Sequence, residues 1–364
     1  MKTTTKLRVA LFFGGVSSEH EVSCVSASAW LRALGQSSCA EQYEAFPVGI
    51  TKDGRWLACH PTPEAMADGS WEQGDCTPCV LSPDRRDHGL WLLKDGKAEL
   101  VRIDICAPVM HGKNGEDGTI QGVFELSQVP YVGNGVTGSA LCMDKILTKK
   151  VLIQEGIPVT DGFDLVHNAA DSVDAADEQI CKTFGYPVVV KPANAGSSVG
   201  ITLVQDKNEL KTALKVAANE DRRVLVEKMM DIREVECAVL GSHEKAEASC
   251  LGEIVKTTAM YDYDTKYIDD TAGLEIPAKL DGDLTETIRG LAVRAFYALD
   301  CTGLARVDFF VEKNTGRVCL NEINTLPGFT DISMYPMLWE RSGLENSVLL
   351  DRLIDFAMNE FGGR

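Results

Sequence analysis

The chain has 364 residues, two to three times the commonest domain length of about 100 to 150 residues, and this length predicts two or three packed units. Hydrophobic residues make up 45% of it and charged residues 25%, a balance that excludes wholesale disorder. The formal net charge of -18 argues against nucleic acid and anionic lipid as partners, because their phosphate groups would be repelled.

Cysteine usage and the absence of targeting signals predict a cytoplasmic protein. The twelve cysteines have no regular spacing, which favours reduced thiols over the disulfide framework of a small secreted domain. The CxxC pair Cys76 and Cys79 has no regular second pair, so a zinc site is not favoured. The apolar run 9–13 is too short for a secretory signal, and no run approaches the roughly 20 apolar residues of a membrane span.

Short β-branched or aromatic runs alternate with longer periodic stretches, which is the pattern of an α/β protein. The elements expected in the first unit are strands at 7–13, 43–50, 103–110 and 129–132 and helices at 22–34 and 119–127. Together they predict a parallel sheet that ends near residue 143. Residues 51–101 interrupt this unit as an elaboration, with a hairpin around 94–97.

Two further units are expected after the first. The second should contain helices at 139–155, 175–184 and 207–219 and strands at 186–191, 200–204 and 224–227. The third should contain strands at 234–240, 246–255, 305–311 and 317–323 and helices at 284–299, 334–341 and 347–360. A long polar and aromatic loop at about 256–273 has the character of a functional lid. The pattern predicts three domains, with bounds 1–143, 144–236 and 237–364.

Three oxygen-bearing side chains fall on one predicted hairpin. Glu322 and Asn324 are two residues apart and share a strand face, and the paired strand can bring Asp308 to the same face. Hard oxygen ligands of this kind suit Mg2+ and leave positions for water and phosphate oxygens. The alternative is a solvated acidic patch. Apolar neighbours such as Val307 and Phe309 argue against it, because unpaired charge in a buried sheet is costly.

Lys191 ends an apolar strand and begins a segment of small residues, 191–200, whose backbone amides could close over a phosphate. The lysine precedes the glycines, so this is not a Walker loop, and a plain β-turn is the alternative. Lys145 could aim a second ammonium group at the same phosphates or be an ordinary exposed lysine. Backbone groups at 227–230 could bond an adenine edge or simply end a strand.

Two glycine-rich loops follow predicted strands in the first unit. The loop 14–19 leaves the carboxyl end of the first strand, where open α/β sheets place ligands, but it lacks the full GxGxxG pattern of a dinucleotide site. The second loop spans 111–118, and its His111 could touch a ligand or cap the following helix.

Seven segments along the chain carry a combined pattern that is more specific than any of them alone. They are GGVSSEHEVS at 14–23, HGKNGEDGTIQG at 111–122, SALCMDK at 139–145, VKPANAGSSVGI at 190–201, YDYDTKY at 261–267, ARVDFF at 305–310 and NEINTLPGFTDISMYP at 321–336. In this order they resemble the D-alanine:D-alanine ligase family of ATP-grasp enzymes.

The resemblance implies a fold and a reaction. The fold is α/β (α+β overall), an N-terminal parallel-sheet, Rossmann-like pre-ATP-grasp domain followed by a two-lobed ATP-grasp fold. The reaction joins two D-alanine molecules through a D-alanyl phosphate and releases ADP and phosphate, supplying peptidoglycan precursors. ATP would be the co-substrate, Mg2+ the cofactor (two ions, with Mn2+ able to substitute), and the assembly a homodimer.

The resemblance also implies roles for individual residues. The ATP-binding residues would be Lys145, Lys191, Ser198, Glu227, Lys228, Met230 and Glu234, and the metal ligands Asp308, Glu322 and Asn324. The catalytic residues would be Glu19, Ser197, Tyr267 and Arg306. The substrate-binding residues would be His111, Lys266, Gly328, Ser333 and Met334.

Within the catalytic set, Glu19 would hold the ammonium of the first D-alanine, and Arg306 with the amide of Gly328 would stabilise the oxyanion. Lys266 and Ser333 would bind the carboxylate of the second D-alanine. A triad of Glu19, Ser197 and Tyr267 would tie the loop at 256–273 over the site, which would protect the acyl phosphate from water.

Two positions discriminate between substrates within the family. The resemblance implies histidine at position 267 in D-lactate ligases, and arginine at position 334 in D-lactate and D-serine ligases. Tyr267 and Met334 therefore favour D-alanine. D-alanine:D-serine ligation, D-alanine:D-lactate ligation and a catalytically inactive nucleotide-binding subunit are the alternatives.

Overall fold

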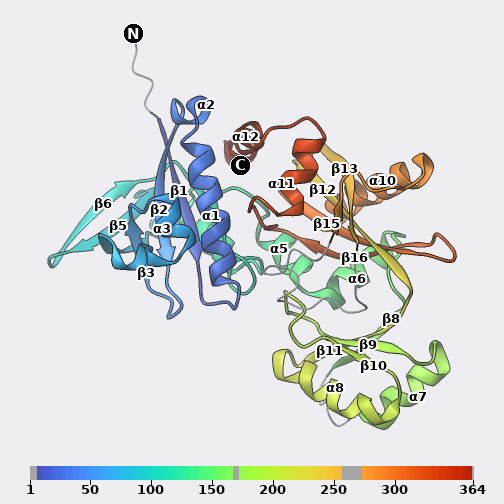
Figure 1. The fold of residues 1–364 in the computed structure, drawn as a ribbon. Coiled ribbons are helices and arrows are strands. Elements are labelled where there is room, and N and C mark those ends of the chain that lie inside the picture. Colours follow the sequence, from blue (N-terminus) through green and yellow to red (C-terminus); the bar gives the residue numbers. More distant parts are fainter. Residues whose placement is uncertain (1–5, 167–171, 256–272, 363–364) are drawn as a thin grey trace.

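The computed structural model describes residues 6–166, 172–255 and 273–362, whose strands form three sheets (Figure 1). The first unit contains β1 (Leu7–Gly14), α1 (His20–Leu34), α2 (Ser37–Ala40), β2 (Tyr43–Ile50), β3 (Trp56–Cys59), α3 (Pro63–Ala67), the 3-10 helix η1 (Ser70–Gln73), β4 (Cys76–Leu81), β5 (Gly89–Lys94), β6 (Lys97–Arg102), β7 (Ile105–Pro108) and α4 (Thr119–Ser127).

The next stretch of chain builds a smaller lobe. It contains α5 (Val136–Met143), α6 (Lys145–Gln154), β8 (Gly162–Val166), α7 (Val173–Thr183), β9 (Val188–Pro192), β10 (Thr202–Val204), α8 (Lys207–Glu220) and β11 (Arg223–Lys228). The last unit contains β12 (Ile232–Gly241), β13 (Ala246–Val255), β14 (Gly273–Glu275), α10 (Gly282–Ala298), β15 (Gly303–Glu312), β16 (Val318–Asn324), α11 (Met334–Arg341) and α12 (Asn346–Gly362).

The first sheet has seven strands in the order β6-β5-β4-β3-β2-β1-β7. The predicted parallel pairing is confirmed for β1 with β2 and with β7. The elaboration at 51–101 adds β3 to β6 as antiparallel strands, so the sheet is mixed. The predicted strand at 129–132 is wrong as a strand, because only a single bridge joins Tyr131 to Cys106.

The predicted helix at 139–155 is wrong as one element, since it breaks into α5 and α6 at Asp144. Asp144 has extended backbone angles, φ -87° and ψ 97°, and its carboxylate accepts hydrogen bonds from the amides of Ile146 (3.1 Å) and Leu147 (3.0 Å). An aspartate in this position satisfies amides that have no partner in the helix. The break places Lys145 at the first turn of α6.

The other two sheets both contribute side chains to one large cavity. The four-stranded sheet has the order β10-β9-β11-β8 and the five-stranded sheet the order β14-β13-β12-β15-β16. Figure 1 shows α7 and α8 covering the outer side of the four-stranded sheet, while α10 and α11 lie against the five-stranded sheet. All neighbouring strands in both sheets are antiparallel.

The buried apolar residues show which units share a hydrophobic core. Val9 of β1 and Trp30 of α1 share a continuous core with Leu240 of β12 and Tyr335 of α11, so the first and last units are packed together. The four-stranded sheet has a core of its own, for example Val190 with Leu214. This separate core makes the small lobe the part best able to shift relative to the rest.

The three predicted domain ranges stay a prediction, although the sheets bear on where they meet. The cut at 236/237 falls inside β12 (Ile232–Gly241), and the four-stranded sheet ends earlier, at Lys228. Leu152 of α6 packs into the core beneath the five-stranded sheet. In the part of the chain that is described, no helix is long and apolar enough to cross a membrane.

Candidate active site

Two adjoining cavities lie where the three sheets meet. The smaller, of about 50 Å³, is lined by eight of the residues that the sequence predicts for the site, namely Glu19, His111, Lys145, Ser197, Arg306, Glu322, Asn324 and Gly328. The larger, of about 900 Å³, is lined by ten of them, namely Lys145, Lys191, Ser197, Ser198, Glu227, Lys228, Met230, Glu234, Asp308 and Glu322. A cavity of that size suits a ligand as large as a nucleotide.

Glu19 stands at the start of α1 and connects the first unit to the small lobe. Its carboxylate accepts a hydrogen bond of 2.5 Å from the hydroxyl of Ser197, which lies 178 positions later in the chain. Gly112 packs directly against it: a Cβ atom built on this glycine, whose φ is +67°, would lie 2.4 Å from Glu19 Oε2. Two of the three members of the predicted triad are therefore in contact, and Tyr267 lies outside the described residues.

His111 lines the smaller cavity, but both of its ring nitrogens bond to the protein. Nδ1 lies 3.0 Å from the carbonyl of Leu326, which can only accept, and Nε2 lies 3.0 Å from the hydroxyl of Ser26. The same hydroxyl accepts from the amide of Phe329 at 3.2 Å. Burial lowers the pKa of His111. A neutral imidazole that donates from Nδ1 fits this network, and it ties the loop at 111–118 to the one that carries Gly328.

Arg306 and Glu116 set the charge of the smaller cavity. Arg306 on β15 makes two hydrogen bonds to Asp308, of 2.8 and 2.7 Å, and an ion pair of 2.9 Å with Glu236 on β12. Glu116, which also lines this cavity, has its pKa raised to about 8 by burial and by the nearby carboxylate of Glu19. The cavity thus places a fixed guanidinium opposite carboxyl groups.

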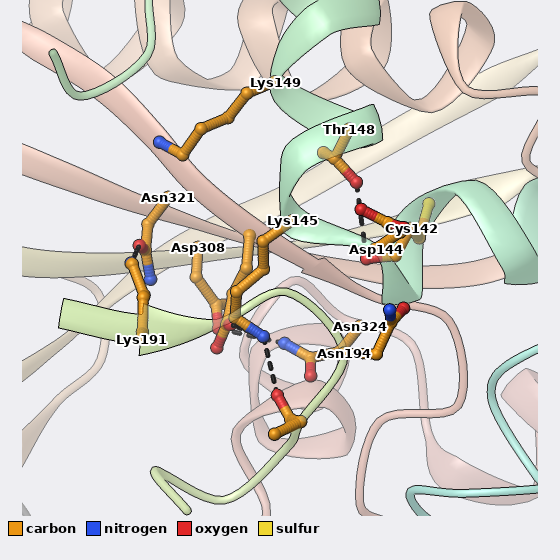
Figure 2. Close-up of polar contacts among 12 residues, drawn as sticks. Cys142, Asp144, Lys145, Thr148, Lys149, Lys191, Asn194, Asp308, Asn321 and Asn324 are labelled. Atoms are coloured by element: carbon orange, nitrogen blue, oxygen red, sulfur yellow. Dashed lines mark hydrogen bonds and ion pairs between the residues drawn. The ribbon is translucent and has the colours of Figure 1, made fainter. Parts of the chain in front are cut away.

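Lysines from two elements line the larger cavity. The ammonium of Lys145 donates to the carbonyl of Ala195 at 2.7 Å and lies 3.5 Å from Glu322 Oε2. Lys191, the last residue but one of β9, donates to the Oδ1 of Asn321 at 3.4 Å. Figure 2 shows these lysines beside Asp308 and Asn321. The structure therefore excludes the reading of Lys145 as an ordinary exposed lysine, since it is 9% exposed.

Two buried polar residues beside this cavity were not predicted from the sequence. Lys149, one turn after Lys145 on α6, forms a buried ion pair with Glu227 of β11. The hydroxyl of Thr160 lines the cavity, is buried, and has no hydrogen-bond partner among the described residues. Lys149 lies four residues after Lys145, and side chains at i and i+4 share a helix face. This spacing could have predicted from the sequence that Lys149 lies near the site.

The three expected metal ligands are brought together. Asp308 and Glu322 are direct partners in the register of β15 and β16, and the amide of Asn324 donates to Asp308 Oδ2 at 3.0 Å. Within the described ranges no group of three or more His, Cys, Asp or Glu side chains forms a metal-binding cluster. Two carboxylates and an amide oxygen nevertheless fit a hard cation that keeps several waters or phosphate oxygens.

Two expected substrate-binding residues, Ser333 and Met334, do not line either of the two cavities. Ser333 caps a turn, accepting from the amide of Thr330 at 3.0 Å, and Met334 is buried where α11 begins. Both side chains are instead held by contacts within the last unit. Lys266 and Tyr267 lie outside the described residues.

Comparison with known proteins places this arrangement in a family. A family model described as the D-ala D-ala ligase N-terminus matches residues 8–134, and one described as the D-ala D-ala ligase C-terminus matches residues 151–355. The chain belongs to the D-alanine–D-alanine ligase family. Its membership confirms the predicted fold class and the predicted activity, ATP-dependent ligation that serves cell-wall synthesis.

Relatives in this family align over nearly their whole length. The D-alanine--D-alanine ligase of Caldicellulosiruptor bescii is 47% identical over 359 residues, 98% of this chain and 96% of that protein. The one from Nocardia farcinica is 46% identical, with 98% of both chains covered.

Two solved structures have the same fold. The VanG D-Ala:D-Ser ligase of Enterococcus faecalis superimposes with a TM-score of 0.87 at 36% identity, covering 97% of this chain and 100% of that one. The D-alanine-D-alanine ligase of Coxiella burnetii gives a TM-score of 0.86 at 35% identity, covering 99% and 96%.

Proposed function

We propose that the larger cavity holds ATP and that the smaller one holds the reacting ends of two D-alanine molecules. The observation that carries this assignment is that Lys145, Ser197 and Glu322 line both cavities. The cavities therefore meet at the ammonium group of Lys145, which lies 3.5 Å from the carboxylate of Glu322. A γ-phosphate entering from one side would encounter a carboxylate entering from the other at this point.

ATP lies along the larger cavity, with its base near Glu227, Lys228 and Met230 and its ribose near Glu234. Its phosphates extend toward Lys191 and Lys145, beneath the loop that carries Ser198. Ser197 and Ser198 both have positive φ, 48° and 60°, which turns successive backbone amides toward one side of the loop. Such a turn binds anions well.

Asp308, Glu322 and Asn324 would hold Mg2+, two ions in the expected arrangement, with Mn2+ as a substitute. The bound metal would supply charge neutralisation between the phosphate oxygens. The chain's own lysines serve the same end, because a carboxylate must approach an anionic phosphate before it can react.

The reaction takes two steps. A carboxylate oxygen of the first D-alanine attacks the γ-phosphorus, and the bond to ADP breaks. The amine of the second D-alanine then attacks the acyl carbon, phosphate leaves, and the amine loses a proton. Glu19 orients the first ammonium group, and Arg306 with the amide of Gly328 faces the oxygen that becomes negative in the second step.

Substrate choice is the finer part of this assignment. Met334 is buried, and a Cβ built on Gly252 would lie 2.6 Å from its sulfur, so the methionine is held in place by β13. An arginine there would have to bring a charge into this apolar contact. We therefore assign D-alanine, rather than D-serine or D-lactate, as the second substrate.

Three broader assignments complete the proposal. The enzyme is cytoplasmic, in keeping with twelve cysteines that are all free thiols in the structure. It works as a homodimer, as the resemblance implies. Lys266, Ser333 and Tyr267 keep their expected roles, the first two at the second carboxylate and the last in the triad with Glu19 and Ser197.

The test measures ADP and dipeptide formed from ATP, Mg2+ and D-alanine, with D-serine and D-lactate as competitors across pH. Native protein should form D-alanyl-D-alanine, and Ser197→Ala should raise the KM for D-alanine because Glu19 loses its hydrogen bond. Ser28→Ala is the matched control: its hydroxyl is buried in α1 and, among the described residues, bonds locally to the carbonyl of Val25 at 2.9 Å. ADP release that does not depend on D-alanine would refute the proposal.

A further inference from the structure

Lys149 occupies an unusual place for a lysine. It lies on α6 and is 6% exposed, whereas its neighbour Lys150 is on the exposed side of the same helix. Figure 2 shows Lys149 and Lys145 extending from one helix, with Lys191 on a neighbouring strand. Lysine is seldom buried without a partner, because removing its ammonium from water is costly.

The partner of Lys149 is shared with a second lysine. Glu227 is 2% exposed, and its two carboxylate oxygens are divided between the ammonium groups of Lys149 and Lys191. Burial alone would raise the pKa of Glu227, but the two lysines outweigh it and hold that pKa below its usual range. The cluster contains two positive charges and one negative charge.

Only one of these lysines is available to a ligand. Lys191 lines the larger cavity and also reaches Asn321 at 3.4 Å, so it can turn toward bound phosphates. Lys149 is not among the described residues that line either cavity. If Lys191 were the sole partner of Glu227, moving to ATP would leave a buried carboxylate without a counter-charge, which is strongly unfavourable.

We propose that Lys149 is a positioning residue: it carries the counter-charge of Glu227 so that Lys191 is free to bind the phosphates of ATP. The inference rests on the proposed function, in which Lys191 is a phosphate ligand. Lys149 itself touches no substrate. Its effect on the reaction passes through Glu227 and appears in ATP binding rather than in the chemical step.

The experiment compares Lys149→Met in the native protein and in the Glu227→Gln background, measuring the KM for ATP, kcat, and the Kd of a non-hydrolysable ATP analogue. In the native background we expect the KM and Kd to rise about ten-fold or more, with a smaller change in kcat. In the Glu227→Gln background the same substitution should change them less than about two-fold, because no buried charge is left to balance. Lys149→Arg should largely restore the native values.

Lys150→Met is the matched control. It removes an ammonium from the adjacent position of α6, but that group is exposed and pairs with Asp164 at 3.2 Å. Exposed pairs of this kind contribute little, so the KM for ATP should stay within about two-fold of the native value.

Three results would overturn the inference. Lys149→Met could leave the KM for ATP unchanged, or it could raise it by the same factor in both backgrounds, which a purely structural role predicts. If Lys149→Met does not fold, the double variant with Glu227→Gln should recover a native thermal transition, and failure to do so would show that Lys149 acts through packing. Lys191→Met separates the two claims: an unchanged KM for ATP there refutes the phosphate role of Lys191 itself.

Discussion

The contact between Gly112 and Glu19 allows one substitution to test the geometry of the catalytic site. Gly112→Ala adds a Cβ that would lie 2.4 Å from Glu19 Oε2. Since carbon and oxygen normally stay about 3.4 Å apart, the carboxylate must move by roughly 1 Å. Moving a catalytic group that far can lower the rate by about 100-fold.

The same substitution also strains the backbone, and a second glycine isolates that effect. Gly112 has φ +67°, a left-handed conformation that costs an alanine about 1 to 2 kcal/mol. Gly96, in the turn between β5 and β6, has φ +73°, and a Cβ there would meet no described atom within 4 Å. Gly96→Ala should therefore have a similar loss of stability without any effect on Glu19.

The assay is D-alanine-dependent ADP release, with thermal unfolding measured in parallel. We expect Gly112→Ala to lower kcat/KM for D-alanine by about 100-fold, and both alanine variants to lose about 1 to 2 kcal/mol of stability. Native kcat/KM in a folded Gly112→Ala protein would refute the reasoning. So would an equal loss of activity in Gly96→Ala.

Three further predictions follow from the site and its supports. Glu116 has a pKa raised to about 8 from an ordinary 4.5, so its stabilising contribution is present below pH 4.5 and is lost as the pH rises through 8. Over that pH window, Glu116→Gln should gain a few kcal/mol of stability relative to the native protein, measured by unfolding at a series of pH values. A stability difference that does not change with pH would contradict this prediction. Asp144→Ala removes both the cap of α6 and the ion pair with Arg223, and should lower the free energy of unfolding by about 2 to 4 kcal/mol. The control Asp206→Ala removes only the exposed cap of α8 and should lower it by about 1 kcal/mol. Equal losses for the two variants in chemical denaturation would show that the ion pair contributes nothing. Glu322→Gln should shift the Mg2+ titration of activity to higher concentration, and a superimposable titration would exclude Glu322 as a metal ligand.

The sequence by itself determined the parts of this protein that depend on local order. Alternating apolar runs and the glycine loops that end them placed most strands and helices, because these patterns follow from the periods of helix and strand. The two-residue spacing of Glu322 and Asn324 determined their common face for the same reason. The order of seven motifs was specific enough to give the family.

Tertiary structure decided which of these groups touch. The break at Asp144 could not be read from helical periodicity, because it depends on a capping carboxylate that also pairs with Arg223 of β11. The ion pair of Arg306 with Glu236 and the hydrogen bonds of His111 to Ser26 and Leu326 likewise join segments whose meeting depends on the whole fold.

Lys149 shows this difference most clearly. Its sequence neighbourhood is that of any lysine on an amphipathic helix, and Lys150 beside it is exposed. Only the folded arrangement removes Lys149 from water and brings it to Glu227 of β11, 78 positions away. Charge pairing inside a protein depends on which surfaces exclude solvent, and that is a property of the folded chain rather than of its local sequence.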